Sequence, residues 1–221
     1  MQMTMKKSPD GQKSPDRLVA YLRNHKAARW AISGLSGVLV LAAVGLLGYP
    51  LFTNVYQTRL QSRLAHQLAT DPSLAQQFRN DAVPVGTSLT RLRMPAIGVD
   101  VVVVEGTSEA ALQAGAGHYP GTPLPCEIGD VAIAGHRTTY GRPFSNVDRL
   151  VPGDRIILDT PVGSCTYEVD RAPFVVLPND TSVVANTPGQ YTLTLTSCTP
   201  KGSASHRIVI KAMMVGVPTQ A

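Results

Sequence analysis

The sequence predicts a mainly β domain that follows an N-terminal transmembrane helix. Two observations support this prediction. Residues 30–58 carry no charge, and from Leu89 onward short β-branched segments alternate with Gly and Pro. Hydrophobic residues make up 43% of the chain, enough to bury a core, and 221 residues leave room for one globular domain plus an appendage.

Eight segments from Leu89 onward have the composition and bounding turns of strands. They are Leu89–Met94, Val99–Val104, Asp130–Gly135, Arg155–Asp159, Cys165–Asp170, Phe174–Leu177, Tyr191–Cys198 and Arg207–Met214. This many short strands in about 130 residues indicate a small closed β-barrel or a sandwich. Residues 108–114 are predicted to form a short helix capped by Ser108.

The apolar run of residues 31–52 is long enough to cross a bilayer, which takes roughly 20 residues. Seven of the twenty Lys and Arg residues lie in the first thirty positions, so the positive-inside tendency predicts a cytoplasmic basic tail at residues 1–30. A cleaved signal peptide is the alternative, but its apolar core is usually only about 7–15 residues long. A buried helix of a soluble protein is the third option. Because the basic residues are concentrated before the apolar run, the net charge of +5 is evidence about the orientation of the chain in the membrane. We therefore expect no nucleic-acid partner.

Residues 53–84 are predicted to form an extracellular helical stalk or linker, because Leu60, Leu64 and Leu68 recur every fourth residue. Residues 85–218 are then the folded β domain. This division gives a single-pass membrane protein that contacts the lipid bilayer through residues 31–52.

Three cysteines occur in the part that is predicted to lie outside the cell, and an odd number there marks one special thiol. Cys126 and Cys165 lie in or beside predicted turns, whereas Cys198 ends a strand. A strand end holds a side chain firmly beside whatever groove the next loop covers. Because the thiolate is the reactive form, Cys198 as a nucleophile needs a partner that promotes ionisation.

Two further residues could supply that partner and an oxyanion donor. His136 also closes a predicted strand, although a lone His at this place is more often a structural residue. Arg207 begins the strand that follows Cys198, and its guanidinium is a permanent, rigid set of donors. Taken alone, Arg207 is more often a surface residue of a strand.

Together these segments resemble the sortase family. Residues 134–154, which begin AGHRTTYG, are similar to the family's histidine segment, and TLTSC at residues 194–198 resembles its TLxTC motif, with Arg207 nine residues later. Ser197 stands where the family usually has Thr. The histidine segment and GHYPGT at residues 117–122 look most like class E sortases, the housekeeping type of high-GC actinobacteria.

The resemblance implies an eight-stranded sortase-type β-barrel with short helices, in which Cys198, His136 and Arg207 meet in one groove. It also implies a cysteine transpeptidase of a Gram-positive cell. Such an enzyme cleaves an LPXTG- or LAXTG-like sorting signal between Thr and Gly through a thioacyl intermediate. It then joins the secreted protein to an amine of a peptidoglycan precursor or a pilin.

Four neighbours are candidates for substrate binding. In class E relatives, a tyrosine of the segment before the histidine strand is associated with recognition of the Ala-containing signal. Tyr119 could therefore select the substrate, or it could have a packing role alone. His118 could line the groove or make a structural hydrogen bond. Thr196 and Ser197 are expected to line the site.

Cys126 and Cys165 either form a disulfide or stay as two buried thiols, and their spacing does not decide between these. No metal or cofactor is expected, because the acidic residues are scattered and no CxxC pair occurs. Two rival functions are a papain-like hydrolase, whose Cys and His come in the reverse order, and an inactive wall-binding module, which should have lost one of the three residues.

Overall fold

The computed structural model describes residues 25–220, and residues 1–24 of the predicted basic tail lie outside this range. The chain divides into two compact units, residues 1–49 and 50–221. Helix α2 (Lys26–Thr70) contributes to both units and contains the predicted span. Among the described residues it is the one helix that is long and apolar enough to cross a membrane. The second unit also contains α3 (Ser73–Arg79), α4 (Glu109–Ala114) and the short 3-10 turns η1 (Pro95–Ile97), η2 (Val147–Arg149) and η3 (Thr181–Val184).

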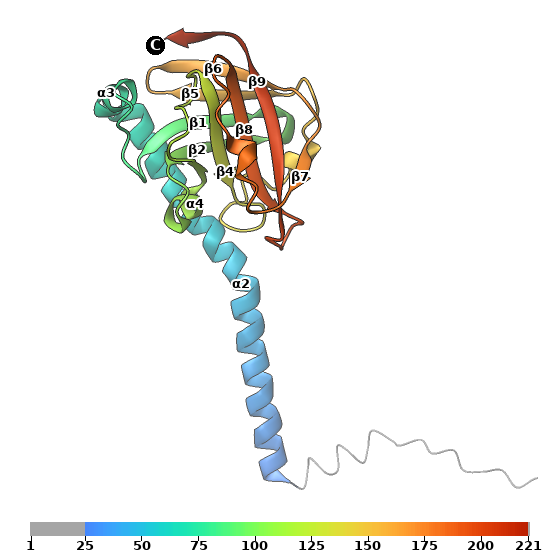
Figure 1. The fold of residues 1–221 in the computed structure, drawn as a ribbon. Coiled ribbons are helices and arrows are strands. Elements are labelled where there is room, and N and C mark those ends of the chain that lie inside the picture. The colour runs from blue at the N-terminus through green and yellow to red at the C-terminus, as the bar shows by residue number, and fades with distance from the viewer. Residues whose placement is uncertain (1–24, 221) are drawn as a thin grey trace, which may run out of the picture. The chain divides into compact units, whose positions relative to one another are not determined.

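Nine strands of the described part form one sheet that closes into a barrel (Figure 1). They are β1 (Ser88–Met94), β2 (Val99–Glu105), β3 (Ala116–His118), β4 (Gly129–Gly135), β5 (Arg155–Thr160), β6 (Gly163–Val169), β7 (Phe174–Val176), β8 (Tyr191–Thr199) and β9 (His206–Gln220). The order is β6-β5-β1-β2-β3-β4-β8-β9, and β6 also pairs with β9, which closes a ring of eight strands. β7 pairs with the first part of β9 only, outside that ring.

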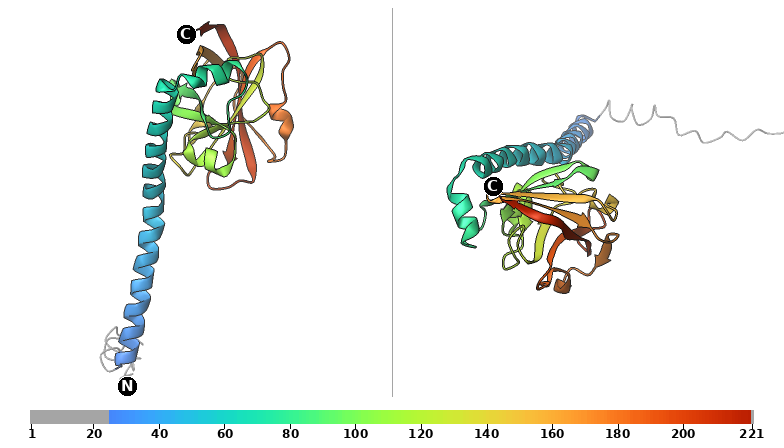
Figure 2. Two further views of the ribbon diagram at one scale, coloured as in Figure 1. Left: turned by 90° about the vertical axis from the view of Figure 1, so that its left-hand side faces the viewer. Right: turned by 90° about the horizontal axis from the view of Figure 1, so that it is seen from above.

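The eight-stranded barrel is therefore confirmed, with one change in which strands build it. Each of the eight predicted segments is a strand, and β3 is an additional one that takes the ring position not filled by β7. The short helix is also confirmed: the Ser108 hydroxyl accepts a hydrogen bond of 3.3 Å from the backbone N–H of Ala111. In Figures 1 and 2, β9 (red) runs beside β8 across the barrel and leads to the C-terminus.

Successive side chains of each strand point to opposite faces of the sheet, and those on one face fill the barrel interior. On β8, Leu193 and Leu195 are fully buried in the main core, where they join Ile133 of β4 and Tyr167 of β6. A second, smaller cluster of Phe78, Leu89 and Leu124 lies under α3. Since apolar side chains fill the inside, polar side chains of β4, β8 and β9 collect on the outside.

Residues 50–70 of α2 belong to the same compact unit as the barrel. Gln61 accepts a hydrogen bond from the backbone N–H of Val102 (2.7 Å) and donates to the carbonyls of Val102 (3.1 Å) and Ala114 (2.6 Å). Ser88 of β1 donates to the carbonyl of Leu64. This part of the predicted stalk thus braces the barrel wall.

Candidate active site

The strand pairing brings together the three residues predicted to be catalytic. Cys198 on β8 is paired directly with Arg207 on β9. On the other side of β8, the parallel strand β4 (which ends at Gly135) is in register up to the pair Ala134 and Thr196, and this register extended by two residues sets His136 level with Cys198. Paired residues of neighbouring strands point to the same face of a sheet. We infer from this register that His136, just past the end of β4, forms a row with Cys198 on β8 and Arg207 on β9.

This row lies on the outer face of the barrel. Leu193, Leu195 and Ser197 alternate inward, so Thr194, Thr196 and Cys198 point outward. Cys198 is partly exposed and is the free cysteine of the described residues. An outward, partly exposed thiol that is fixed at a strand end can be reached by an extended peptide.

His136 is half-buried and is held on one side by an aromatic ring. Its imidazole lies 5.6 Å from the ring of Tyr140, between centroids, at an angle of 37°. Its Nε2 atom is buried and has no hydrogen-bond partner among the described residues. Burial lowers the pKa of His136, and the nearby negative charge of Glu109 opposes this shift. Burial therefore disfavours the charged imidazolium in the unbound site, and the Nε2 atom has no protein group among the described residues that would hold its proton.

Arg207 is oriented by the loop that precedes its own strand. Its Nη1 donates to the carbonyls of Ala204 (3.1 Å) and His206 (3.2 Å). His206, which was excluded from the site because neighbours alternate, is exposed, and its Nδ1 lies 3.1 Å from the Ser205 hydroxyl. The guanidinium is thus held at the edge of the row, where it can donate a hydrogen bond to a carbonyl of a bound substrate.

Two close contacts fix the ends of β4 and β8 next to the row. The Ser197 hydroxyl is buried and donates a hydrogen bond of 2.5 Å to the carbonyl of Gly135. This side chain therefore ties the residues just before Cys198 and His136 together, and it faces inward rather than toward a substrate. Gly135 has no room for a side chain, because a Cβ there would lie 2.7 Å from the ring of Phe144.

Arg137 is a buried charged residue that sequence reasoning did not single out. Its Nη1 donates to the Thr199 hydroxyl (3.1 Å), and its Nη2 donates to the carboxylate of Asp148 (2.7 Å) and to the carbonyl of Ser145 (3.3 Å). It thereby connects the residue after Cys198 to the loop after His136. The visible signal was a basic residue next to the candidate His, with an acidic residue later in the same segment.

Comparisons with known proteins agree on one family. The sortase domain model matches residues 92–215, which is more than half of the chain. The chain belongs to the sortase family. Sortase SrtE1 of Streptomyces coelicolor is 31% identical over 81% of this chain, and the chain spans 54% of the length of that relative. Sortase D of Bacillus subtilis is 31% identical over 78% of this chain and 90% of its own length.

Solved structures support the same conclusion. The structure of a Clostridium perfringens sortase D5 transpeptidase superposes with a TM-score of 0.62 at 27% identity, over 72% of this chain and 98% of that chain. The match to SrtE1 is consistent with the class E resemblance. Sortases are cysteine transpeptidases, so the family and the row of three residues point to the same kind of enzyme.

Tyr119 of this sortase lies beside the row. Its hydroxyl is 2.9 Å from that of Thr196, which lies two residues before Cys198 on the same outward face. The backbone N–H of Tyr119 also donates to the carbonyl of Ala132 on β4. Both candidates for substrate contact are thus next to each other, and Thr196 lies on the same face of β8 as Cys198.

His118 is placed in the barrel wall. It is almost completely buried, with Nδ1 at 2.7 Å from the Glu105 carboxylate and Nε2 at 2.9 Å from the carbonyl of Pro123. Because both ring nitrogens lie next to acceptors, His118 has the structural hydrogen bonds that were the alternative to a substrate contact.

A second buried polar group of this sortase was also missed. Asp130 at the start of β4 is fully buried and accepts hydrogen bonds from Thr194 (2.7 Å) and Lys211 (3.1 Å). The ammonium of Lys211 donates in addition to the carbonyl of Val183 in η3 (2.6 Å). The outer face below the row is therefore tied to the segment between β7 and β8.

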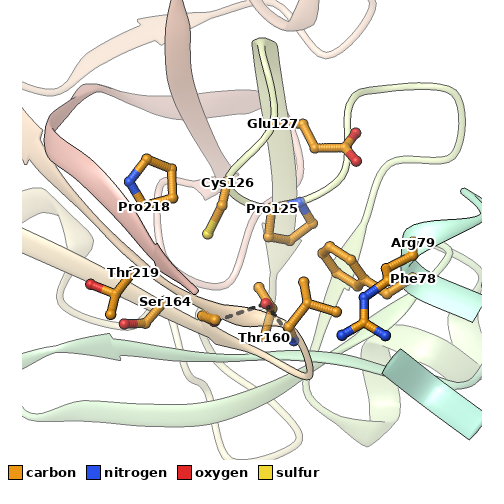
Figure 3. A pocket seen from close by; sticks show the side chains of 11 residues that line it. Phe78, Arg79, Pro125, Cys126, Glu127, Thr160, Ser164, Pro218 and Thr219 are labelled. Carbon is orange, nitrogen blue, oxygen red and sulfur yellow. Dashed lines mark hydrogen bonds between the residues drawn. The ribbon is translucent and has the colours of Figure 1, made fainter. Parts of the chain in front are cut away.

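Cys126 and Cys165 form a disulfide, with an S–S distance of 2.04 Å. A cavity of about 380 Å³ lies beside it, and Figure 3 shows its lining side chains, which include Phe78, Arg79 and Glu127. None of the three residues of the row lines this cavity. The described residues contain no group of three or more His, Cys, Asp or Glu that could hold a metal ion.

Proposed function

We propose that this sortase is an extracellular, membrane-anchored cysteine transpeptidase that cleaves an LPXTG- or LAXTG-like sorting signal between Thr and Gly. It then transfers the cleaved protein to an amine of the cell wall or of a pilin. The observation that supports this most is the pairing of Cys198 with Arg207 on β9, together with a register between β4 and β8 that, extended by two residues, sets His136 level with Cys198 on its other side. A thiol, a proton carrier and a cationic donor are what acyl transfer to an amine requires.

The first half-reaction begins after the thiol proton of Cys198 has passed to His136. The Cys198 thiolate attacks the carbonyl carbon of the signal's Thr, and the carbonyl electrons move to its oxygen. The Arg207 guanidinium stabilises this oxyanion. When the carbonyl forms again, the bond between carbon and the Gly nitrogen breaks, and His136 gives its proton to that nitrogen. The products are a thioacyl enzyme and a peptide with a free Gly amine.

In the second half-reaction, the acceptor amine attacks the thioester, and His136 takes the proton that the amine loses. The carbon–sulfur bond breaks and Cys198 is released as a thiolate. His136 and Cys198 thus return to their starting protonation states after each cycle. Water can replace the amine, which would give hydrolysis as a slower side reaction.

Residues 31–52 of α2 anchor the enzyme in this proposal, with the basic N-terminal tail in the cytoplasm and the barrel outside. The excess of Lys and Arg before the span supports this orientation. The disulfide between Cys126 and Cys165 supports it as well, because disulfides persist in oxidising compartments.

Tyr119 and Thr196 are proposed to contact the second position of the signal, because their hydroxyls meet beside Cys198. Peptides with Pro or with Ala at that position then test which signal fits. Thr196 faces the substrate groove in this proposal, while Ser197 and His118 support the wall behind it.

The test uses the full chain in detergent, a sorting-signal peptide of either type, and an excess of an amine acceptor such as triglycine. Mass spectrometry should show the acyl group of the peptide joined to the amine, and Cys198→Ala should give no product. Acid as the single product, at every amine concentration, would instead indicate a hydrolase. Binding of the peptide without any product would indicate the inactive module.

A further inference from the structure

The part of α2 that follows the span candidate contacts the loop after His136. In this part of the helix, Thr53 and Gln57 are almost completely buried, at 4% and 8% exposure, although most residues before Thr53 are exposed. These two residues are one helical turn apart, so their side chains lie on the same face of α2. The Asn54 side-chain oxygen accepts a hydrogen bond of 3.3 Å from the backbone N–H of Gly141.

The turn that receives these contacts has an unusual backbone. Tyr140, Gly141 and Arg142 have φ angles of +48°, +66° and +43°, so two residues with side chains adopt a conformation that favours glycine. Such a turn persists only where its surroundings hold it. At Gly141 the helix comes so near that a Cβ would overlap the Gln57 amide.

The same turn contacts the candidate catalytic imidazole directly, through the side chain of Tyr140. The ring of Tyr140, which precedes Gly141, lies 5.6 Å from the ring of His136. The backbone N–H of Phe144 donates to the carbonyl of His136 (3.0 Å), and that of Ser145 donates to Arg142 (3.0 Å), so the loop is connected internally. A displacement of Gly141 is therefore passed to the surroundings of His136.

We propose that Asn54 and Gln57 are positioning residues that hold the turn of residues 140–142 and, through Tyr140, the imidazole of His136. This inference rests on the proposed function, in which His136 carries the proton. It makes the helix that continues from the membrane-span candidate part of the catalytic apparatus. Neither residue touches the reacting atoms, so their effect is on the chemical step and not on substrate affinity.

Gln61 provides a matched control. It is the same residue type one turn further along α2, but it makes its three hydrogen bonds to Val102 and Ala114, not to the loop. If the helix served only to stabilise the domain, Gln61→Ala and Gln57→Ala would have the same consequences.

The experiment compares the full chain with Gln57→Ala, Asn54→Ala, Asn54→Asp and Gln61→Ala. For Gln57→Ala we expect kcat of transpeptidation to fall about 10- to 100-fold, with KM changed less than about twofold, because small displacements of a catalytic group are costly. Asn54→Ala should have a smaller effect of the same kind. Asn54→Asp keeps an acceptor for the Gly141 N–H and should recover most of the activity. Gln61→Ala should lower the melting temperature and leave kcat within about threefold of the parent.

A second readout does not depend on turnover. Histidine-labelled chain, observed by NMR, reports the titration of His136, which His136→Gln assigns. In Gln57→Ala the imidazole should gain access to water, so its pKa should rise toward the ordinary value. Unchanged titration in Gln57→Ala, equal loss of kcat in Gln61→Ala, or no recovery in Asn54→Asp would each overturn the inference. If the parent chain showed no transpeptidation but Gln57→Ala still changed the titration of His136 as expected, the proposed function would be wrong and the positioning role would stand.

Discussion

Strand β4 begins beside one cysteine and ends beside another, and the two ends are held in different ways. Before its first residue, Cys126 is joined covalently to Cys165 of β6. After its last residue comes His136, level with Cys198 in the inferred row, where Ser197 bonds to the carbonyl of Gly135 and Arg137 bonds to the side chains of Thr199 and Asp148. At about 3.3 Å per residue, the two ends of this seven-residue strand lie about 20 Å apart.

The disulfide end of β4 serves the stability of the fold, whereas the other end serves the reaction. A covalent bond at one end limits the freedom of the unfolded chain and needs no adjustment during a reaction. The other end must let a sulfur form and break a bond, so it uses contacts that hold the backbone and leave the thiol free. With two of three cysteines bonded, Cys198 also has no cysteine partner within the described part of the chain.

The largest effect is expected at the reactive end. Cys198→Ala should reduce kcat/KM for the sorting peptide by at least about 10³-fold, because the nucleophile is lost. The free energy of unfolding should change by less than about 1 kcal/mol, since Cys198 is partly exposed. Peptide turnover and urea unfolding measure the two quantities. Residual turnover near that of the parent would mean that the reaction does not use this thiol.

The opposite pattern is expected at the disulfide end. The bond closes a loop with a sequence separation of 39, so the double change Cys126→Ala and Cys165→Ala should cost about 4 kcal/mol of unfolding free energy. Below the new unfolding transition, kcat/KM should stay within about threefold of the parent. A loss of activity in molecules that are still folded would show that the disulfide end and the reactive end are coupled.

Arg207, at the reactive end, has two possible roles: it stabilises the oxyanion or it steers the substrate backbone. If it stabilises the oxyanion, Arg207→Ala should lower kcat about 10²-fold with little change of KM. Arg207→Lys keeps the charge but not the fork of donors, so an intermediate loss is expected. Arg171→Ala, an exposed arginine that pairs with Asp170, is the control. A rise of KM at unchanged kcat would assign Arg207 to substrate binding instead.

Much of the barrel could be predicted from the sequence because its strands are short, β-branched and bounded by Gly or Pro. β3 was missed, since Ala116, Gly117 and His118 have little strand propensity, and the pairing of this segment is decided by β2 and β4. The ring position of β7 was equally hidden, because it depends on where the long strand β9 changes partners from β7 to β6.

At the site, the row of three residues follows from strand ends, but the supporting contacts do not. The inward direction of Ser197 could have been predicted from the alternation that excluded His206, because Thr196 and Ser197 cannot both face the groove. The role of Arg137 could not, since its partners Ser145 and Asp148 lie in a loop whose path no pattern defines. The same holds for Lys211, which reaches Asp130 and Val183 across the sheet.

The smallest expected effect concerns the acid side of the pH profile. In the proposed cycle one proton is shared between Cys198 and His136, so protonating both stops the reaction. Burial lowers the pKa of His136, and the acid limb of kcat/KM should therefore lie below the ordinary histidine pKa of about 6.5.

The charge of Glu109 favours the imidazolium and so raises the pKa of His136. Glu109→Gln should therefore move the acid limb of kcat/KM to still lower pH. Glu127→Gln, near the disulfide end, should leave the limb where it is, because Glu127 lines the cavity beside Cys126 rather than the row. An acid limb that moved upward in Glu109→Gln, or equally in both variants, would mean that the group titrating there is not His136, since only a negative charge near that imidazole can act with this sign and at this end of the strand.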